Sequence, residues 1–170
     1  MGTQAQDALY TQAAAEFGPA LERLARVYEA DPDQRRDLLQ DIHLALWRSF
    51  AIFNGQCSLR TWTYRVAHNT GISGRIRKRG ARLVSLDEVA ETPAPDDAEA
   101  AASEAQALAR LVALIRGLKP PDDQVMLLYL EDLDAAAIGE ITGLSAGAVA
   151  TRIHRIKKIL GRRFGQEGDA

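Results

Sequence analysis

The sequence has little of the chemistry on which disulfides, metal sites and membrane insertion depend. Cys57 is the one cysteine, which excludes an intramolecular disulfide and a cysteine-rich zinc site. His43, His68 and His154 are scattered without the spacing of metal ligands. No apolar run approaches the roughly 20 residues of a membrane span, and the N-terminus lacks a secretory pattern. We therefore expect a cytoplasmic protein without membrane insertion, metal or other cofactor.

Catalytic motifs and strand patterns are also missing. Neither a Walker loop nor a nucleophile elbow occurs, so no catalytic residue can be proposed and we expect that the protein is not an enzyme. Aromatic residues make up only 6% of the chain, whereas Ala and Leu are abundant, which favours helix over strand. Because no stretch alternates with a period of two, the predicted fold is all-α.

The net charge of −2 conceals three blocks of uniform sign. Residues 60–86 hold seven basic residues and no acidic one, and residues 83–109 hold seven acidic residues and no basic one. Residues 141–166 then hold six basic residues and no acidic one. This order predicts two anion-binding surfaces separated by a solvated spacer.

The Thr-Pro-Ala-Pro stretch at 92–95 breaks any helix and marks a domain boundary. Before it, helices are predicted at about 8–29, 33–51 and 59–79. After it, they are predicted at about 103–117, 121–131, 134–142 and 146–164. The expected architecture is two small helical domains, residues 8–82 and 105–165, joined by a flexible acidic linker at 83–104.

The helix at 33–51 follows Asp31-Pro32, a capping residue and a proline suited to the first turn. Helical spacing places an apolar stripe toward the core, consisting of Leu38, Leu39, Ile42, Leu46 and Phe50. Leu44 and Trp47 fall on the opposite face among polar side chains. Either this pair forms a partner surface, or a neighbouring helix covers Trp47.

The segment at 59–79 combines basic and aromatic side chains. Its inward stripe is predicted to consist of Leu59, Trp62, Val66, Asn69, Ser73 and Ile76. Its outward side is predicted to carry Arg60, Tyr64, His68, Gly71, Arg75, Lys78 and Arg79. Cations meet phosphates and flat rings stack on unpaired bases, so this face predicts binding to a separated DNA strand, with a solvated charged face as the alternative.

The C-terminal segment has the pattern of a helix-turn-helix. A short apolar helix contains Leu133, Ala137, Ile138 and Ile141, with Gly139 where the chain could approach closely and Gly143 at a left-handed turn. Ser145 is suited to cap the next helix, which buries Val149, Ile153, Ile156 and Leu160. Its other face carries Gly147, Ala148, Thr151, Arg155, Lys158 and Arg162. The pattern predicts a duplex-reading helix, and a plain helical hairpin is the alternative.

Four stretches together resemble the extracytoplasmic-function (ECF) group of the sigma-70 family. DLLQDIHLALW at 37–47 is similar to the core-polymerase-binding helix of region 2, and LRTWTYRVAHN at 59–69 to its promoter-melting helix. LKPPDDQVMLL at 118–128 and IGEITGLSAGAVATRIHR at 138–155 are similar to region 4. The resemblance covers roughly 10–82 and 105–164, in the family's order.

The resemblance implies a non-catalytic specificity subunit that directs promoter recognition, strand opening and transcription initiation. Its partners would be promoter DNA, the clamp helices of the largest polymerase subunit, the flap of the second-largest subunit and an anti-sigma factor. The core-polymerase contacts would be Asp37, Gln40, Asp41, Leu44 and Trp47. The −10 element contacts would be Asn54, Gln56, Ser58, Arg60, Trp62, Tyr64, Arg65, His68, Asn69, Arg75, Lys78 and Arg79. The −35 element contacts would be Ser145, Gly147, Ala148, Thr151, Arg152, Arg155 and Lys158.

Some positions depart from the family pattern. Ala148 and Ala150 stand where the family often has polar residues, and Gly139 stands where it commonly has Ala. Phosphate contacts by Arg152, Arg155 and Lys158 are therefore better supported than base-specific readout. Two alternatives stay open: a regulator that binds duplex DNA without polymerase, and an adaptor or enzyme whose basic helices bind an acidic protein or a nucleotide.

Overall fold

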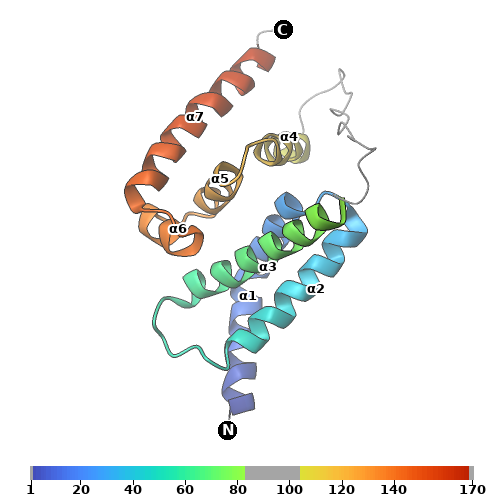
Figure 1. Cartoon of the computed structure of the whole chain (residues 1–170), viewed down its shortest axis with the longest axis vertical. Coiled ribbons are helices and arrows are strands. Elements are labelled where there is room, and N and C mark those ends of the chain that lie inside the picture. Colours follow the sequence, from blue (N-terminus) through green and yellow to red (C-terminus); the bar gives the residue numbers. More distant parts are fainter. Residues whose placement is uncertain (1, 83–103, 169–170) are drawn as a thin grey trace.

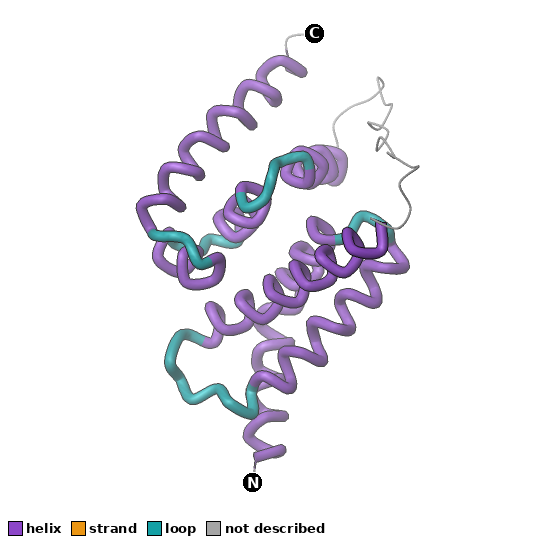
Figure 2. Tube along the Cα trace, in the orientation of Figure 1, coloured by secondary structure: helices purple, strands orange, loops and turns teal. Residues whose placement is uncertain are grey.

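All regular secondary structure among the described residues is helical, which confirms the all-α prediction (Figure 1, Figure 2). The structure is a computed structural model that describes residues 2–82 and 104–168, with the side chains of residues 3–78 and 104–163. Its helices are α1 (Gly2–Tyr28), α2 (Pro32–Ser49), α3 (Leu59–Arg82), α4 (Glu104–Arg116), α5 (Asp122–Leu130), α6 (Ala135–Thr142) and α7 (Ala146–Gly168). The predicted linker, apart from Glu104, lies outside the described residues.

Helices α1, α2 and α3 pack against one another and form the N-terminal unit (Figure 1). Asp31 caps α2 as predicted, because its Oδ1 accepts hydrogen bonds from the backbone N–H groups of Asp33 and Gln34 at 2.9 and 3.0 Å. Ile42 and Leu46 of α2 and Leu21 and Leu24 of α1 are all fully buried in the hydrophobic core. Burial of each such side chain stabilises the unit by about 2 kcal/mol.

The outward face predicted for 59–79 is partly wrong. Tyr64 is 2% exposed, His68 is 6% exposed and Gly71 is buried, whereas Ile76, which was predicted to face inward, is 63% exposed. Asn69 and Ser73, also predicted inward, are exposed. The physical reason is that the side of α3 carrying His68 and Gly71 packs against Tyr28 of α1, so that the buried stripe in this half of α3 is rotated away from the predicted one.

Helices α4 to α7 form the C-terminal unit, in which α5, α6 and α7 surround a core of Val125, Leu128, Ile138, Val149 and Ile156. The apolar stripe predicted for the last helix is confirmed, since all four of its members are buried. Helical periodicity thus identified the part of this core that α7 contributes, whereas Val125 and Leu128 of α5 were not assigned to the core in advance.

The two units pack together, with α4 against α1 and α6 against α3 (Figure 1). In the same view α7 lies on the side of the C-terminal unit that faces away from α1–α3. The contact was not predicted, because the helix-breaking stretch at 92–95 indicated two separate domains. It determines which charged side chains are accessible.

Candidate polymerase and nucleic-acid interfaces

The predicted polymerase surface lies on the face of α2 opposite its core stripe. Asp37, Gln40 and Asp41 are exposed, and Leu44 keeps 47% of its surface accessible. Trp47 is half-buried, and its Nε1 donates a hydrogen bond of 2.8 Å to Asp7 Oδ1 of α1. Both alternatives thus apply in part: a neighbouring helix partly covers Trp47, while Leu44 is open to a partner.

The loop before α3 exposes the polar side chains that the sequence analysis assigned to the −10 element. Asn54, Gln56 and Ser58 are exposed, and Gly55 adopts a positive φ of 80° that suits glycine. Gln56 Oε1 accepts a hydrogen bond from the Asn54 N–H at 2.9 Å, which gives the loop a defined turn. Trp62, in contrast, is 8% exposed and is packed beneath the loop, with its Nε1 donating to Ser49 Oγ at 2.9 Å.

Arginines of α3 are directed at the C-terminal unit. Arg60 donates to the main-chain carbonyl of Glu131, Arg75 Nη1 lies 2.5 Å from Asp123 Oδ2, and Arg65 Nη2 lies 3.7 Å from Glu140 Oε2. Lys78 instead pairs with Glu29 of the N-terminal unit. The side chain of Arg79, another predicted −10 contact, lies outside those described.

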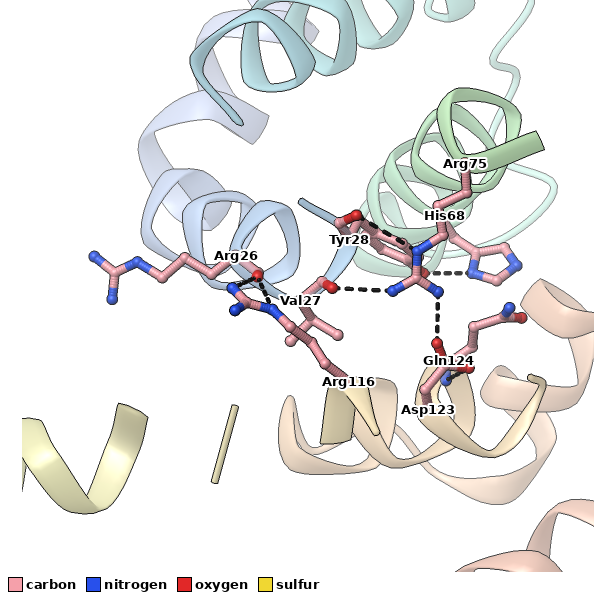
Figure 3. Close-up of polar contacts among 8 residues, drawn as sticks. All are labelled: Arg26, Val27, Tyr28, His68, Arg75, Arg116, Asp123 and Gln124. Carbon is pink, nitrogen blue, oxygen red and sulfur yellow. Dashed lines mark hydrogen bonds and ion pairs between the residues drawn. The ribbon is translucent and has the colours of Figure 1, made fainter. Parts of the chain in front are cut away.

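Arg75 is the centre of a buried cluster shared by α1, α3 and α5 (Figure 3). Its guanidinium lies 4.9 Å from the centroid of the Tyr28 ring and donates to Val27 O at 2.9 Å. Tyr28 Oη and His68 Nδ1 form a hydrogen bond of 2.8 Å. Burial lowers the pKa of His68 to about 4, opposed by the charge of Asp123 and reinforced by that of Arg75. His68 is therefore neutral at pH 7 and, in this arrangement, is not a cation available to phosphate.

Glu131, which follows α5, is the centre of a second interface cluster. Its carboxylate accepts two hydrogen bonds from Arg23 of α1, at 2.6 and 2.7 Å, and one from Tyr64 Oη at 3.1 Å. Burial and the charge of Glu131 raise the pKa of Tyr64 to about 12, so its hydroxyl remains a donor. Arg60 lies 5.7 Å from the centroid of the same ring.

The helix-turn-helix geometry agrees with the prediction. Gly143 has a φ of 81° at the end of α6, and Ser145 Oγ accepts from the Ala148 N–H at 3.1 Å at the start of α7. A Cβ at Gly139 would lie 2.6 Å from the carbonyl oxygen of Leu144, so the turn folds tightly onto α6. The predicted close approach is thus to the turn itself.

The outer face of α7 is accessible but already bears an ion-pair partner. Gly147, Thr151, Arg155 and Lys158 are exposed, whereas Ala148 and Arg152 are half-buried. Asp122 of α5 accepts from Arg152 Nη1 and Arg155 Nη2, each at 2.7 Å. Two of the three predicted phosphate contacts are therefore paired within the unit.

The acidic partners in these contacts, Asp122, Asp123 and Glu131, were not singled out in the sequence analysis. Glu131 lies 108 residues from Arg23, and Asp123 lies 48 residues from Arg75. No helical periodicity links residues so far apart. The one available signal was charge: the first turn of α5 places two carboxylates next to each other.

Comparison with known proteins agrees with this organisation. The family model Sigma-70 region 2 matches residues 14–82, and Sigma-70, region 4 matches residues 108–160. The ECF RNA polymerase sigma factor SigW of Bacillus subtilis is 28% identical over 157 residues, covering 83% of this chain and 78% of SigW. The RNA polymerase sigma factor YlaC of the same organism is 30% identical over 125 residues, covering 72% of each chain.

A solved structure of CnrH in complex with the cytosolic domain of CnrY is similar in fold. The TM-score is 0.68 with 24% sequence identity, and the match covers 97% of this chain and 95% of that one.

The two family models and the relatives together show that the chain belongs to the sigma-70 family of RNA polymerase sigma factors. Within that family it is a factor of the ECF type. This membership indicates a non-catalytic regulatory protein. Among the described residues, no helix is long and apolar enough to cross a membrane.

Proposed function

We propose that the N-terminal unit, residues 8–82, binds core polymerase through α2 and the −10 element through α3 and the loop before it. The observation that carries the polymerase assignment is Leu44, a leucine that keeps 47% of its surface exposed among the polar side chains of Asp37, Gln40 and Asp41. An apolar side chain in a polar surround is the pattern of a contact that becomes buried on binding. Trp47 would contribute the edge of its ring that α1 leaves uncovered.

The exposed loop at 54–58 would receive a base from the opened strand, and the cations of α3 would hold its phosphates. Asn54, Gln56 and Ser58 offer hydrogen-bonding groups at the surface of this loop. Strand opening would draw on binding energy, because contacts to unpaired bases and phosphates offset the cost of unpairing. Trp62, Tyr64 and His68 are buried while the two units are packed together, so in that arrangement they support α3 and do not contact DNA directly.

The C-terminal unit, residues 105–165, would bind the −35 element as duplex DNA, with residues 83–104 as the connection between the two units. The N-terminus of α7 carries Ser145, Gly147, Ala148 and Thr151, and the next turns carry Arg152, Arg155 and Lys158. Small side chains at the tip favour contacts to thymine methyl groups and groove shape, while the cations bind phosphates. The flap of the second-largest polymerase subunit would hold this unit at the promoter.

A protein partner that restrains the factor is part of the proposal. CnrH, which has a similar fold, is solved with the cytosolic domain of CnrY, and we propose that an anti-sigma factor binds this chain in the cytoplasm. A regulator that binds duplex DNA without polymerase is less well supported, because region 2 accounts for 14–82 of the chain.

The test is transcription in vitro with core polymerase of the source bacterium on a library of promoter fragments. The full chain should start transcription from a subset of fragments, and Leu44→Ala should weaken binding to core. Leu108→Ala is the matched control, because Leu108 of α4 is 43% exposed and lies outside the proposed surface. Equal affinity of both variants for core would contradict the assignment of α2, and absence of both core binding and transcripts would contradict the function.

A further inference from the structure

The arginines of α3 that the proposed function assigns to the opened strand are held by the C-terminal unit. Among the described side chains, all three arginines that were predicted to bind the −10 element have a partner there: Arg60, Arg65 and Arg75. The closer of the two ion pairs is that of Arg75 with Asp123, at 2.5 Å, and it lies within the cluster shown in Figure 3. The packed arrangement thus covers the strand-binding face.

The contact is specific, because it buries charged groups together with their partners. Asp123 is 2% exposed and Glu131 is 8% exposed. A buried carboxylate is strongly disfavoured unless ion pairs and hydrogen bonds replace its water. Glu131 receives them from Arg23 and Tyr64, and Asp123 from Arg75. These pairings therefore define how the two units are oriented relative to each other.

The same segment also engages the second DNA-binding face. Asp122 precedes Asp123 in the first turn of α5 and binds Arg152 and Arg155 of α7. Two carboxylates, which we call the α5 carboxylates (Asp122 and Asp123), thus pair with cations on both faces, while the Glu131 carboxylate holds Arg23 and Tyr64 of the N-terminal unit. Arginine recognises carboxylate and phosphate oxygens with the same fork of N–H groups, so the α5 carboxylates occupy positions that DNA phosphates would take.

We propose that the α5 carboxylates are an internal competitor of promoter DNA and that the packed arrangement of the two units is a self-inhibited state. This inference rests on the proposed function, in which α3 holds the opened strand. The strand and α5 cannot occupy Arg60 and Arg75 together, so DNA binding requires the units to separate. A ligand that binds only the separated form shifts the population toward it, and the two events are thermodynamically coupled.

Substitution of Arg23 tests the proposal, because the two possible roles of Arg23 predict opposite changes in DNA affinity. It lies on α1, it is not among the predicted DNA contacts, and its side chain holds Glu131. If Arg23 acted on DNA only through its charge, Arg23→Gln would weaken binding. If it instead holds the units together, Arg23→Gln leaves a buried carboxylate short of its partner, promotes separation and strengthens binding.

The experiment compares Arg23→Gln and Glu131→Gln with Arg26→Gln and Asp132→Asn in the full chain. Arg26 lies on α1 and contributes only its carbonyl to an interface hydrogen bond, which the substitution keeps. Asp132 adjoins Glu131 and has a φ of 61°, a conformation that Asn tolerates, so Asp132→Asn makes the same change in charge. The probe is a fluorescein-labelled single-stranded oligodeoxynucleotide of mixed sequence, with affinity measured by anisotropy and separation by small-angle X-ray scattering.

Arg23→Gln and Glu131→Gln should each raise the affinity for the single strand by at least about fivefold, the low end of typical coupling between linked equilibria. Each should also increase the radius of gyration. The double variant should gain little more than either single one, because both remove the same contact. A weakened affinity in Arg23→Gln, as in Arg26→Gln, would overturn the proposal. So would stronger binding without expansion, or expansion without stronger binding.

Promoter-dependent transcription by the same variants separates this result from the proposed function. If the variants start transcription with core polymerase but bind the single strand no better than the parent chain, the self-inhibited state is wrong and the sigma function stands. If no variant binds core or starts transcription, the proposed function itself fails.

Discussion

The ring of Tyr28 lies directly against the backbone of Gly71, so that a Cβ atom at Gly71 would lie 2.7 Å from Tyr28 Cγ. Tyr28 is the last residue of α1, and its hydroxyl is bonded to His68 one turn before Gly71. Glycine at position 71 therefore lets α1 and α3 approach closely enough for that hydrogen bond to form.

We predict that Gly71→Ala destabilises the chain even though alanine is the better helix former. The new methyl group must displace a buried ring, and overpacking of this kind costs typically about 1–3 kcal/mol. The measurement is thermal unfolding followed by circular dichroism, in which 1 kcal/mol corresponds to roughly 2–4 °C in a chain of this length.

Gly74→Ala is the matched control one turn further along α3. Its Cβ would lie 3.9 Å from Leu38 Cδ1, an ordinary van der Waals contact. We expect this variant to be more stable than the parent chain by about 1 kcal/mol, from helix propensity alone. If both variants shift the transition in the same direction, the close contact between Gly71 and Tyr28 is not a determinant of stability.

The tight turn of the helix-turn-helix leads to a second prediction. A Cβ at Gly139 would meet the carbonyl oxygen of Leu144 at 2.6 Å, and a backbone atom cannot move aside as a side chain can. Gly139→Ala should therefore lower the unfolding temperature and weaken binding to duplex DNA, because the turn that orients α7 must shift. Gly147→Ala, with nothing within 4 Å of the added Cβ, should leave the fold at least as stable. Equal stability of Gly139→Ala and the parent chain would show that the turn can relax.

Burial of His68 makes stability depend on pH. Its pKa is lowered from 6.5 to about 4 in the folded chain. Between these two values the unfolded chain binds the proton and the folded chain does not, so the free energy of unfolding falls as the pH falls from 6.5 toward 4. The full loss is on the order of 3 kcal/mol, reached below the folded pKa. Arg75 and Asp123, which face the ring, reinforce and oppose this shift respectively.

His68→Gln should flatten this dependence while keeping a polar partner for Tyr28 Oη. His154→Gln is the control, because His154 is exposed on α7. His43, whose pKa burial also lowers, contributes equally in both variants, so the difference between their denaturation curves isolates His68. Parallel loss of stability in both variants from pH 6.5 to 4 would contradict the assignment.

Helical periodicity was sufficient to predict the helices and the core-facing stripes of α2 and α7, because each stripe is a local property of one helix. Val149, Ile153, Ile156 and Leu160 were recognised in this way and are buried. The same reasoning failed on α3, where Tyr64 and His68 were assigned to the surface. His68 is buried because its side of α3 packs against Tyr28 of α1, and periodicity within α3 cannot show which side a neighbouring helix will cover.

The candidate site was predictable only in part, for a related reason. The cations of α3 and α7 form runs without acids, which composition reveals directly. Arg75 meets Asp123 and Arg60 meets the Glu131 carbonyl only because the two units pack together, whereas Asp122 meets Arg152 and Arg155 through the packing of α5 on α7. The charge blocks predicted a solvated acidic spacer and gave no partner for the basic side chains, whereas Arg65 and Arg75 pair with carboxylates of the C-terminal unit and Lys78 pairs with Glu29.

The pairing of Asp122 with both Arg152 and Arg155 supports a final prediction about duplex DNA. Asp122→Asn should strengthen binding to a duplex of mixed sequence and steepen its dependence on salt, since two guanidinium groups become free to contact phosphates. Each additional phosphate contact adds about 0.9 to the magnitude of the slope of log affinity against log salt. Asp132→Asn removes the same charge from an exposed carboxylate beyond the end of α5 and controls for the change in net charge. Titrations by anisotropy at several salt concentrations measure both slopes. If the slopes of the two variants coincide, Asp122 does not compete with phosphate for these arginines, and its ion pairs serve only to join α5 to α7.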